Sequence, residues 1–187
     1  MKNVMILGAP GSGKGTQGKL LAEHLGIPQV STGELLRAAV KAKTPLGLKA
    51  KGYMDAGSLV PDDVIFGLIQ EILDSPPAAK GVLMDGFPRT IPKAEAVDRM
   101  LKGKQAKVDR VILLEVPEQE LVQRLLGSAA KEGRADDNAE SITKRLQVFK
   151  EQTAPLIAFY EGRGIVKRVE GTGTVDEIQQ RMQKVAN

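Results

Sequence analysis

Short apolar runs alternate with longer amphipathic segments along the whole chain. This alternation is typical of repeated βα units, and strands that are apolar on both faces are typical of a parallel sheet covered by helices on both sides. The pattern therefore predicts an α/β fold with a mostly parallel sheet. The predicted strands are Val4 to Leu7, Val82 to Met84, Val111 to Val116 and Ile165 to Val169, with Gln29 and Val30 as a weaker candidate.

Helix boundaries are marked by capping residues and glycines. Three capping residues stand three positions before a glutamate, an arrangement that satisfies first-turn amides reciprocally. They are Ser31, Asp137 and Thr174. Glycines that can adopt the left-handed conformation are predicted to end helices at Gly26, Gly57, Gly103 and Gly162. In the last helix, helical spacing predicts that the core residues are Val175, Ile178, Met182 and Val185.

Two regions interrupt the βα rhythm. Residues 31–60 hold two short helices without a clear strand, and residues 127–137 read as a small, polar, glycine-bounded loop. Irregular insertions in a compact domain are often lids or binding loops. The sequence therefore predicts one domain spanning residues 1–187, with two inserted flaps.

Composition narrows the class of protein. The chain has 187 residues, of which 42% are apolar, so it can build a real core. No stretch is long and apolar enough for a spanning helix, and the first residues lack a signal-peptide cleavage pattern, so we expect a cytoplasmic protein without a membrane partner. With no cysteine and the single histidine His24, a zinc site is not expected. Any metal would be a hard cation held by oxygen.

The net charge of +4 raises the question of nucleic acid binding. The basic residues are spread along the chain and mixed with acids, as on a solvated surface. Two tyrosines, four phenylalanines and no tryptophan leave few platforms for stacking on bases. A nucleic-acid partner is therefore the last of the functions that we consider.

The strongest local signal is the glycine-rich segment from Gly8 to Thr16. It follows an apolar strand directly and precedes a helical segment that reaches Leu25. Its glycines allow backbone amides to turn around an anion at a helix start, and Lys14 can reach the β- and γ-phosphates. Because Gly15 stands where such loops usually carry a hydroxyl, the hydroxyl arrives at Thr16 and direct ligation of Mg²⁺ is not expected. The segment predicts a phosphate-binding P-loop.

Five motifs in order resemble those of the adenylate kinase family of nucleoside monophosphate kinases. They are GAPGSGKGTQ from Gly8, STGELLR from Ser31, LVPDD from Leu59, DGFPRT from Asp85 and GRADDNAESITKRL from Gly133. The likeness spans nearly the whole chain. It implies a P-loop three-layer α/β/α fold with a five-stranded parallel sheet and two mobile flaps, which are the monophosphate-binding insertion 31–60 and a short lid 127–137.

The resemblance also implies site residues. For ATP they are Gly11, Ser12, Gly13, Lys14, Gly15 and Thr16 at the phosphates, and Arg124 and Gly173 at the base. For AMP they are Thr32, Arg37, Ser58, Leu59, Val60, Gly86, Phe87, Pro88, Arg89 and Lys93. Arg134 and Arg145 would bridge the reacting phosphates of both nucleotides. Asp85 would orient waters on Mg²⁺, and the implied catalytic set is Lys14, Asp85, Arg89, Arg134 and Arg145.

The implied reaction, ATP + AMP ⇌ 2 ADP, suits these residue types. Phosphoryl transfer spreads negative charge over oxygens, so catalysis depends mainly on positioning and electrostatic stabilisation. Arginine binds phosphate oxygens bidentately and stays charged. The attacking phosphate oxygen is already ionised at neutral pH, so no general base is required. The family is mostly monomeric, and we expect a monomer.

Two positions depart from the family pattern and keep alternatives open. Lys93 stands where the family usually has glutamine, whose amide both donates to and accepts from adenine, whereas lysine only donates. Ser128 stands where the family usually carries an arginine four residues after Arg124, which predicts slower turnover unless Lys131 or another cation substitutes. The alternatives are a UMP/CMP kinase of the same fold and a nucleotide-binding relative with weakened catalysis.

Overall fold

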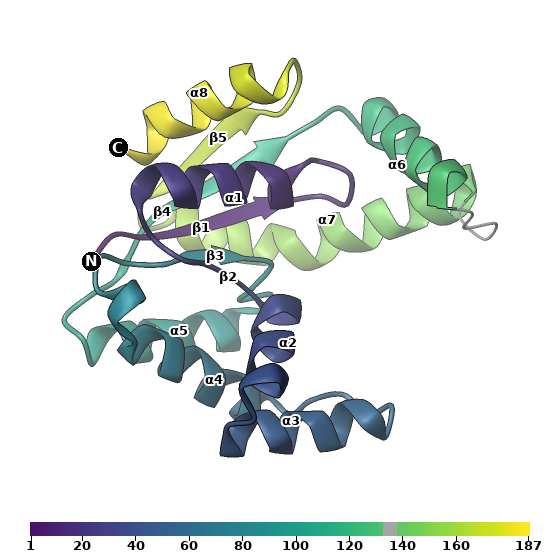
Figure 1. Ribbon diagram of the computed structural model, residues 1–187. Coiled ribbons are helices and arrows are strands. Elements are labelled where there is room, and N and C mark those ends of the chain that lie inside the picture. The colour runs from purple at the N-terminus through teal and green to yellow at the C-terminus, as the bar shows by residue number, and fades with distance from the viewer. Residues whose placement is uncertain (133–137) are drawn as a thin grey trace.

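The computed structural model describes residues 1–132 and 138–187. Its centre is a five-stranded parallel sheet with the strand order β2-β3-β1-β4-β5 (Figure 1). All five predicted strands are confirmed, including the weak candidate at Gln29 and Val30, so the predicted parallel α/β fold is confirmed. The strands are β1 (Asn3–Gly8), β2 (Gln29–Ser31), β3 (Leu83–Asp85), β4 (Val108–Glu115) and β5 (Val166–Glu170).

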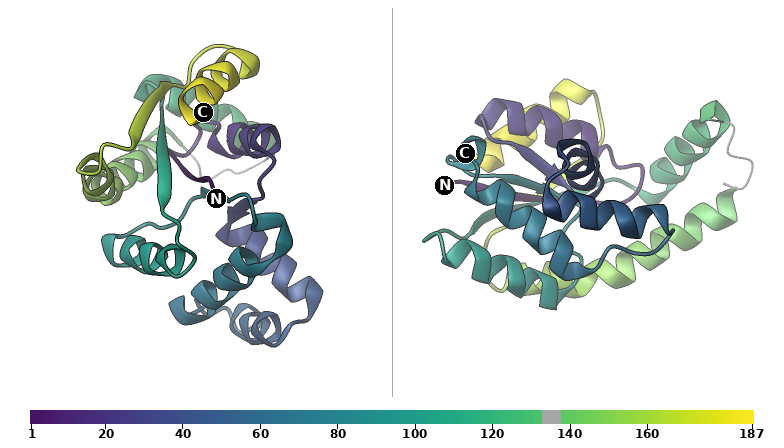
Figure 2. Two further views of the ribbon diagram at one scale, coloured as in Figure 1. Left: turned by 90° about the vertical axis from the view of Figure 1, so that its left-hand side faces the viewer. Right: turned by 60° about the horizontal axis from the view of Figure 1, so that its bottom comes forward.

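Helices cover both faces of the sheet, as Figures 1 and 2 show. On β1, Val4 and Ile6 face one apolar cluster while Met5 and Leu7 face the other, which is the period-two alternation of a strand. The cluster around Val4 and Ile6 includes residues of α1 (Lys14–Leu25) and α8 (Val175–Ala186). The other cluster includes residues of α4 (Asp62–Asp74), α5 (Ile91–Lys102) and α7 (Ala139–Glu161). The result is the three-layer architecture that the sequence implied.

Two helical arms extend from this body. One holds α2 (Thr32–Ala42) and α3 (Pro45–Asp55), which confirms the prediction of two short helices in residues 31–60. The other holds α6 (Glu118–Glu132) beside the start of α7 (Figure 1). A short 3₁₀ turn, η1 (Pro76–Ala78), precedes β3.

The predicted loop at residues 127–137 is wrong for its first half. Residues 127–132 continue α6, and residues 133–137 lie outside the part of the chain that the structure describes. The composition explains the difference, because the segment after Gly127 is rich in alanine, lysine and glutamate, which are strong helix formers. A single glycine costs a helix only about 1 kcal/mol.

The capping predictions at Ser31 and Thr174 are confirmed, and the third is shifted by one residue. Ser31 accepts from the Glu34 amide at 3.4 Å, and Thr174 exchanges hydrogen bonds with Glu177. At α7 the cap is Asn138 and not Asp137: Asn138 Oδ1 accepts from the Ser141 amide at 2.9 Å. Serine at the third helical position completes the reciprocal pair, so the glutamate is not needed.

The predicted helix ends are correct in position but only partly in conformation. Gly26 has φ 67° and Gly57 has φ 71°, in the left-handed region. Gly103 and Gly162 also follow their helices, but both keep right-handed backbone, with φ of −59° and −58°. In the last helix, Val175 is 49% exposed and not in the core, because it is the first residue and precedes the sheet-facing positions. Ile178 and Met182 are buried and Val185 packs beside them, as predicted.

In the described parts of the chain, we find no helix with the length and apolarity needed to cross a membrane.

Candidate active site

The loop between β1 and α1 forms a cradle of backbone amides. Gly11 and Gly13 have φ of 85° and 86°, which non-glycine residues rarely adopt, and the Ser12 amide donates to the Ala9 carbonyl at 3.0 Å. Among the described residues, no side chain caps the start of α1. Ser12 Oγ is buried and has no hydrogen-bond partner in the same part of the chain. Open amides and an orphaned hydroxyl at a helix start fit an anionic ligand.

A cation stands directly beside this cradle. Lys14 Nζ lies 2.6 Å from Asp85 Oδ1, and Asp85 is 7% exposed. The Gln29 side-chain amide donates to Asp85 Oδ2 at 3.3 Å and to the Gly15 carbonyl at 3.4 Å. Asp85 ends β3, next to β1, at the carboxyl edge of the sheet where α/β proteins bind ligands. The sequence predicted Lys14 and Asp85 as site residues but gave no sign of Gln29. Gln29 reaches Asp85 only because β2 pairs with β3.

This donor set fits Mg²⁺ bound largely through substrate. Among the described residues, no three carboxylates or histidines gather in a metal-binding group. Mg²⁺ commonly keeps several waters and is held by one or two carboxylates together with substrate phosphates. Asp85, a single carboxylate beside the phosphate cradle, matches that role.

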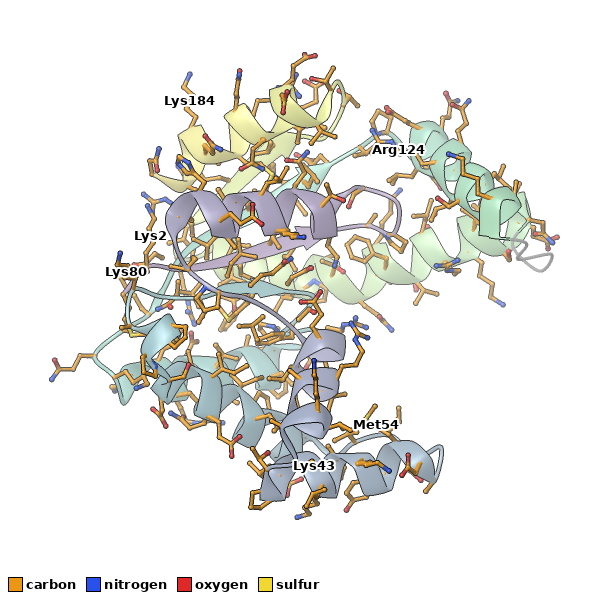
Figure 3. All side chains as sticks on the ribbon, viewed as in Figure 1. Lys2, Lys43, Met54, Lys80, Arg124 and Lys184 are labelled. Atoms are coloured by element: carbon orange, nitrogen blue, oxygen red, sulfur yellow. The ribbon has the colours of Figure 1, made fainter. Side chains whose placement is uncertain are left out.

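Arg124 joins α6 to the phosphate loop (Figure 3). Its guanidinium donates to the carbonyls of Gly11 at 3.3 Å, Ser12 at 3.4 Å and Gly171 at 3.1 Å, and to Glu120 Oε1 at 2.6 Å. The structure therefore places Arg124 beside the loop and the turn that follows β5. Gly173, the other residue assigned to the ATP base, lies in that same turn and has φ 110°.

The predicted acceptor residues gather around a separate cavity of about 510 Å³. Nine of them line it, from the α2–α3 arm, the segment before α4, and the turn between β3 and α5. They are Thr32, Ser58, Leu59, Val60, Gly86, Phe87, Pro88, Arg89 and Lys93. Arg37 does not line it; its guanidinium lies toward Gly33. Leu59 is 94% exposed at the rim, so its side chain is available to cover a ligand.

A second cavity of about 290 Å³ joins the phosphate loop to the acceptor cavity. Gly8, Pro10 and Lys14 line one side of it, while Gly86, Pro88 and Arg89 belong to both cavities. Arg89 Nε donates to the Gly86 carbonyl at 2.8 Å. The two predicted nucleotide sites therefore meet between Lys14 and Arg89.

Arg145 and Arg134 are the two arginines predicted to bridge the reacting phosphates. Arg145 of α7 lines a cavity of about 500 Å³ together with Pro10 of the phosphate loop and Lys144. Arg134 lies outside the described residues.

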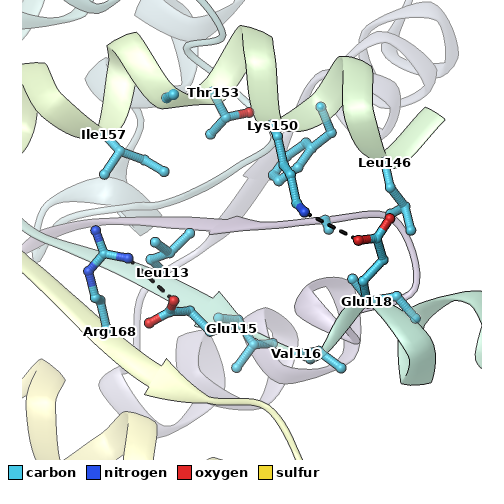
Figure 4. A pocket seen from close by; sticks show the side chains of 14 residues that line it. Leu113, Glu115, Val116, Glu118, Leu146, Lys150, Thr153, Ile157 and Arg168 are labelled. Carbon is cyan, nitrogen blue, oxygen red and sulfur yellow. Dashed lines mark hydrogen bonds and ion pairs between the residues drawn. The ribbon is translucent and has the colours of Figure 1, made fainter. Parts of the chain in front are cut away.

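A cavity of about 300 Å³ between the ends of β4 and β5 and helix α7 is a different kind of space (Figure 4). Its walls are largely apolar, and its charged residues are paired: Lys150 with Glu118 at 3.5 Å, and Arg168 with Glu115 at 3.3 Å. Hydrogen bonds to Glu161 and Glu115 raise the pKa of Arg168, so this guanidinium stays charged and paired. None of the predicted site residues that the structure describes lines this cavity.

Comparison with known proteins agrees with this geometry. The sequence model of the family described as adenylate kinase matches residues 6–165. Over 178 residues the chain is 49% identical to the adenylate kinase of Leptospira biflexa, covering 95% of this chain and 96% of the relative. It is 50% identical over 179 residues to that of Thermus thermophilus, with 96% and 94% covered. For Porphyromonas gingivalis the identity is 47% over 187 residues, with 100% and 96% covered.

Proposed function

The chain belongs to the adenylate kinase family, and from that premise we propose that it transfers the terminal phosphoryl group of ATP to AMP, giving two ADP. One observation carries the assignment of roles: the cavity lined by Lys14 shares Gly86, Pro88 and Arg89 with the acceptor cavity. A donor phosphate in the loop and an acceptor phosphate beside Arg89 would therefore meet.

Charge explains why cations surround this meeting point. ATP and a monophosphate together bring about six negative charges, counting a terminal phosphate whose second pKa is about 6 as nearly dianionic. Lys14 would bind the donor phosphates and Arg89 the acceptor phosphate, while Arg145 and Arg134 would bridge them. Once bound to the phosphates, these cations would stabilise the developing charge without further reorganisation.

We propose that Mg²⁺ accompanies ATP and that Asp85 orients its waters. Asp85 would hold the cation through water, and the cation would supply positive charge to the phosphates. For Asp85 to serve it, Lys14 must leave the carboxylate and move to the phosphates. The hydrogen bond from the Gln29 amide to Asp85 Oδ2 would remain, so the carboxylate would stay oriented after Lys14 leaves it.

We also propose that residues 31–60 and 127–137 close over the nucleotides as flaps. The exposed Leu59 supports the first of these, because an apolar side chain at a cavity rim gains from covering a base. As the resemblance implies, the protein would act as a cytoplasmic monomer on small nucleotides, and size-exclusion chromatography with light scattering tests the oligomeric state.

A coupled assay tests the reaction. Purified protein is given Mg·ATP with AMP, CMP, UMP or GMP, beside a Lys14→Ala variant and a Lys51→Ala control. Lys51 is paired with Asp55 on the exposed surface of α3, so its loss should leave the rate unchanged. We expect ADP from AMP, and a loss of about 10²–10³ in turnover for Lys14→Ala. No diphosphate from any pair of nucleotides would refute the proposed function.

A further inference from the structure

Besides Arg89, the wall of the acceptor cavity carries a cation and an anion side by side. Lys93 Nζ lies 3.5 Å from Asp62 Oδ1, and both residues line the cavity. Neither lines the joining cavity beside Lys14. The pair is therefore set away from the point where the two nucleotides meet.

Electrostatics decides which part of the acceptor faces this pair. The acceptor phosphate is anionic and is expected at Arg89, which lines both cavities. The Asp62 carboxylate would repel a phosphate group. The base end of the nucleotide therefore faces Asp62 and Lys93.

Helix stability does not account for Lys93. It is the third residue of α5, where the positive end of the helix dipole disfavours a cation, whereas Asp62 is the first residue of α4, where an anion is favoured. The side chains are 39% and 64% exposed, and ion pairs of this kind contribute little to stability. A lysine in an unfavourable position at a cavity wall points to a role in binding.

The two side chains together offer a donor next to an acceptor. An ammonium group only donates hydrogen bonds, and a carboxylate only accepts them. Adenine and cytosine present a ring nitrogen acceptor beside an exocyclic amine, so each group of the pair would find its complement. Hypoxanthine, guanine and uracil present an oxo group beside a ring N–H, so a carboxylate would face an acceptor that it cannot satisfy.

We propose that Lys93 and Asp62 act as a pair that selects acceptor nucleotides with an amino base over those with an oxo base. Lys93 donates to the ring nitrogen and Asp62 accepts from the amine. Together they would replace the glutamine that the family usually carries at position 93, whose amide both donates and accepts. This inference rests on the proposed function and names the acceptor class of the same site: AMP is used in preference to IMP, and CMP in preference to UMP.

AMP and IMP are the sharpest probes, because they differ only in the amine or oxo group and the adjoining ring nitrogen. Equilibrium binding of each is measured without ATP, and kcat/KM of each with Mg·ATP. A site that hydrogen-bonds its ligand rejects a mismatched analogue strongly, but partial exposure weakens this. We expect wild-type protein to favour AMP by on the order of 10- to 100-fold.

Two substitutions should move the two ligands differently. Lys93→Met removes the donor and should weaken AMP binding by about tenfold without weakening IMP binding. Asp62→Asn supplies an amide that can donate to the oxo group, so IMP binding should strengthen by about tenfold. Lys51→Met, which removes an exposed cation of α3 that does not line the acceptor cavity, should change neither ligand.

The outcomes separate the two proposals. If both variants change AMP and IMP binding by the same factor, the pair is only structural and the inference is overturned, even where AMP is phosphorylated. If the wild-type protein produces no ADP from AMP, the proposed function itself fails. Because AMP and IMP are compared within each variant, loss of folded protein cannot imitate a change in their ratio.

Discussion

Replacing Asp85 with asparagine tests the central ion pair of the site. The carboxylate accepts from Lys14 at 2.6 Å and from Gln29 at 3.3 Å, and it neutralises a region that also contains the positive end of α1. Asparagine keeps the shape of the side chain but removes its charge. We expect Asp85→Asn to lower stability and, at the same time, to strengthen ATP binding in the absence of Mg²⁺.

The structure sets the size of both effects. Breaking a buried ion pair costs about 3–5 kcal/mol, whereas exposed pairs contribute about 0–1 kcal/mol. The Asp85 side chain is 8% exposed and that of Lys14 is 30% exposed, so this pair lies between the two classes. We expect unfolding to become easier by about 2 kcal/mol, which is a shift of about 1 M in the urea midpoint. Freed from Asp85, Lys14 should bind phosphate about tenfold more tightly, equal to about 1.4 kcal/mol.

Urea unfolding and calorimetric titration with Mg²⁺-free ATP measure the two quantities. Asp55→Asn is the matched control, because Lys51 lies at the same 2.6 Å from Asp55 while the side chains are 51% and 62% exposed. Its unfolding free energy should change by less than about 0.5 kcal/mol. Equal stability losses at Asp85 and Asp55, or weaker binding of Mg²⁺-free ATP by Asp85→Asn, would refute the reasoning.

Two further substitutions test the arms. Ser128→Arg places a cation one helical turn after Arg124. We expect turnover to rise at least about tenfold, since a transition-state arginine is worth about 10³–10⁵ in rate in favourable cases. An unchanged steady-state kcat would show that this position does not face the reacting phosphates. Gly47→Ala adds a Cβ that would overlap the Ala39 carbonyl where α2 and α3 pack. It should cost about 1–3 kcal/mol in thermal unfolding and raise KM for AMP more than for ATP, whereas Gly52→Ala, with open space around its Cβ, should stabilise α3. Equal effects at the two glycines would contradict the packing argument.

The sequence predicted the fold where burial left a local pattern. The runs that became β1 and β4 are nearly continuous in apolar residues because both faces of these strands are covered. The edge strand β2 has only three residues, with Val30 buried, and its pairing with β3 is a tertiary contact, so its signal was weak. The last turns of α6, residues 127–132, were mistaken for a loop because a helical segment made of small and polar residues carries no apolar stripe.

The site residues likewise divide into those that a local sequence pattern predicts and those that only the fold brings together. The phosphate cradle is predictable because glycines, one lysine and a helix start define it within nine consecutive residues. Gln29 carries no such signal, since its partner Asp85 is 56 positions away and only the fold brings the two together. The partnership of Lys93 with Asp62 is of the same kind, because 31 positions separate them and only the fold brings the first turns of α4 and α5 within reach of each other.

Three of the cations assigned to nucleotides share one feature that bears on how the site binds: each forms an ion pair with a carboxylate. Lys14 is held by Asp85, Lys93 by Asp62, and Arg124 by Glu120, which lies four positions earlier on the same helix. Uncompensated cations gathered in one cleft would repel one another and destabilise the empty protein. Because these three cations are paired, a bound nucleotide would have to replace a protein carboxylate at each of them. The net gain in binding free energy would therefore depend on the strength of each ion pair. The half-exposed Lys93–Asp62 pair should open most easily and the largely buried Lys14–Asp85 pair least easily.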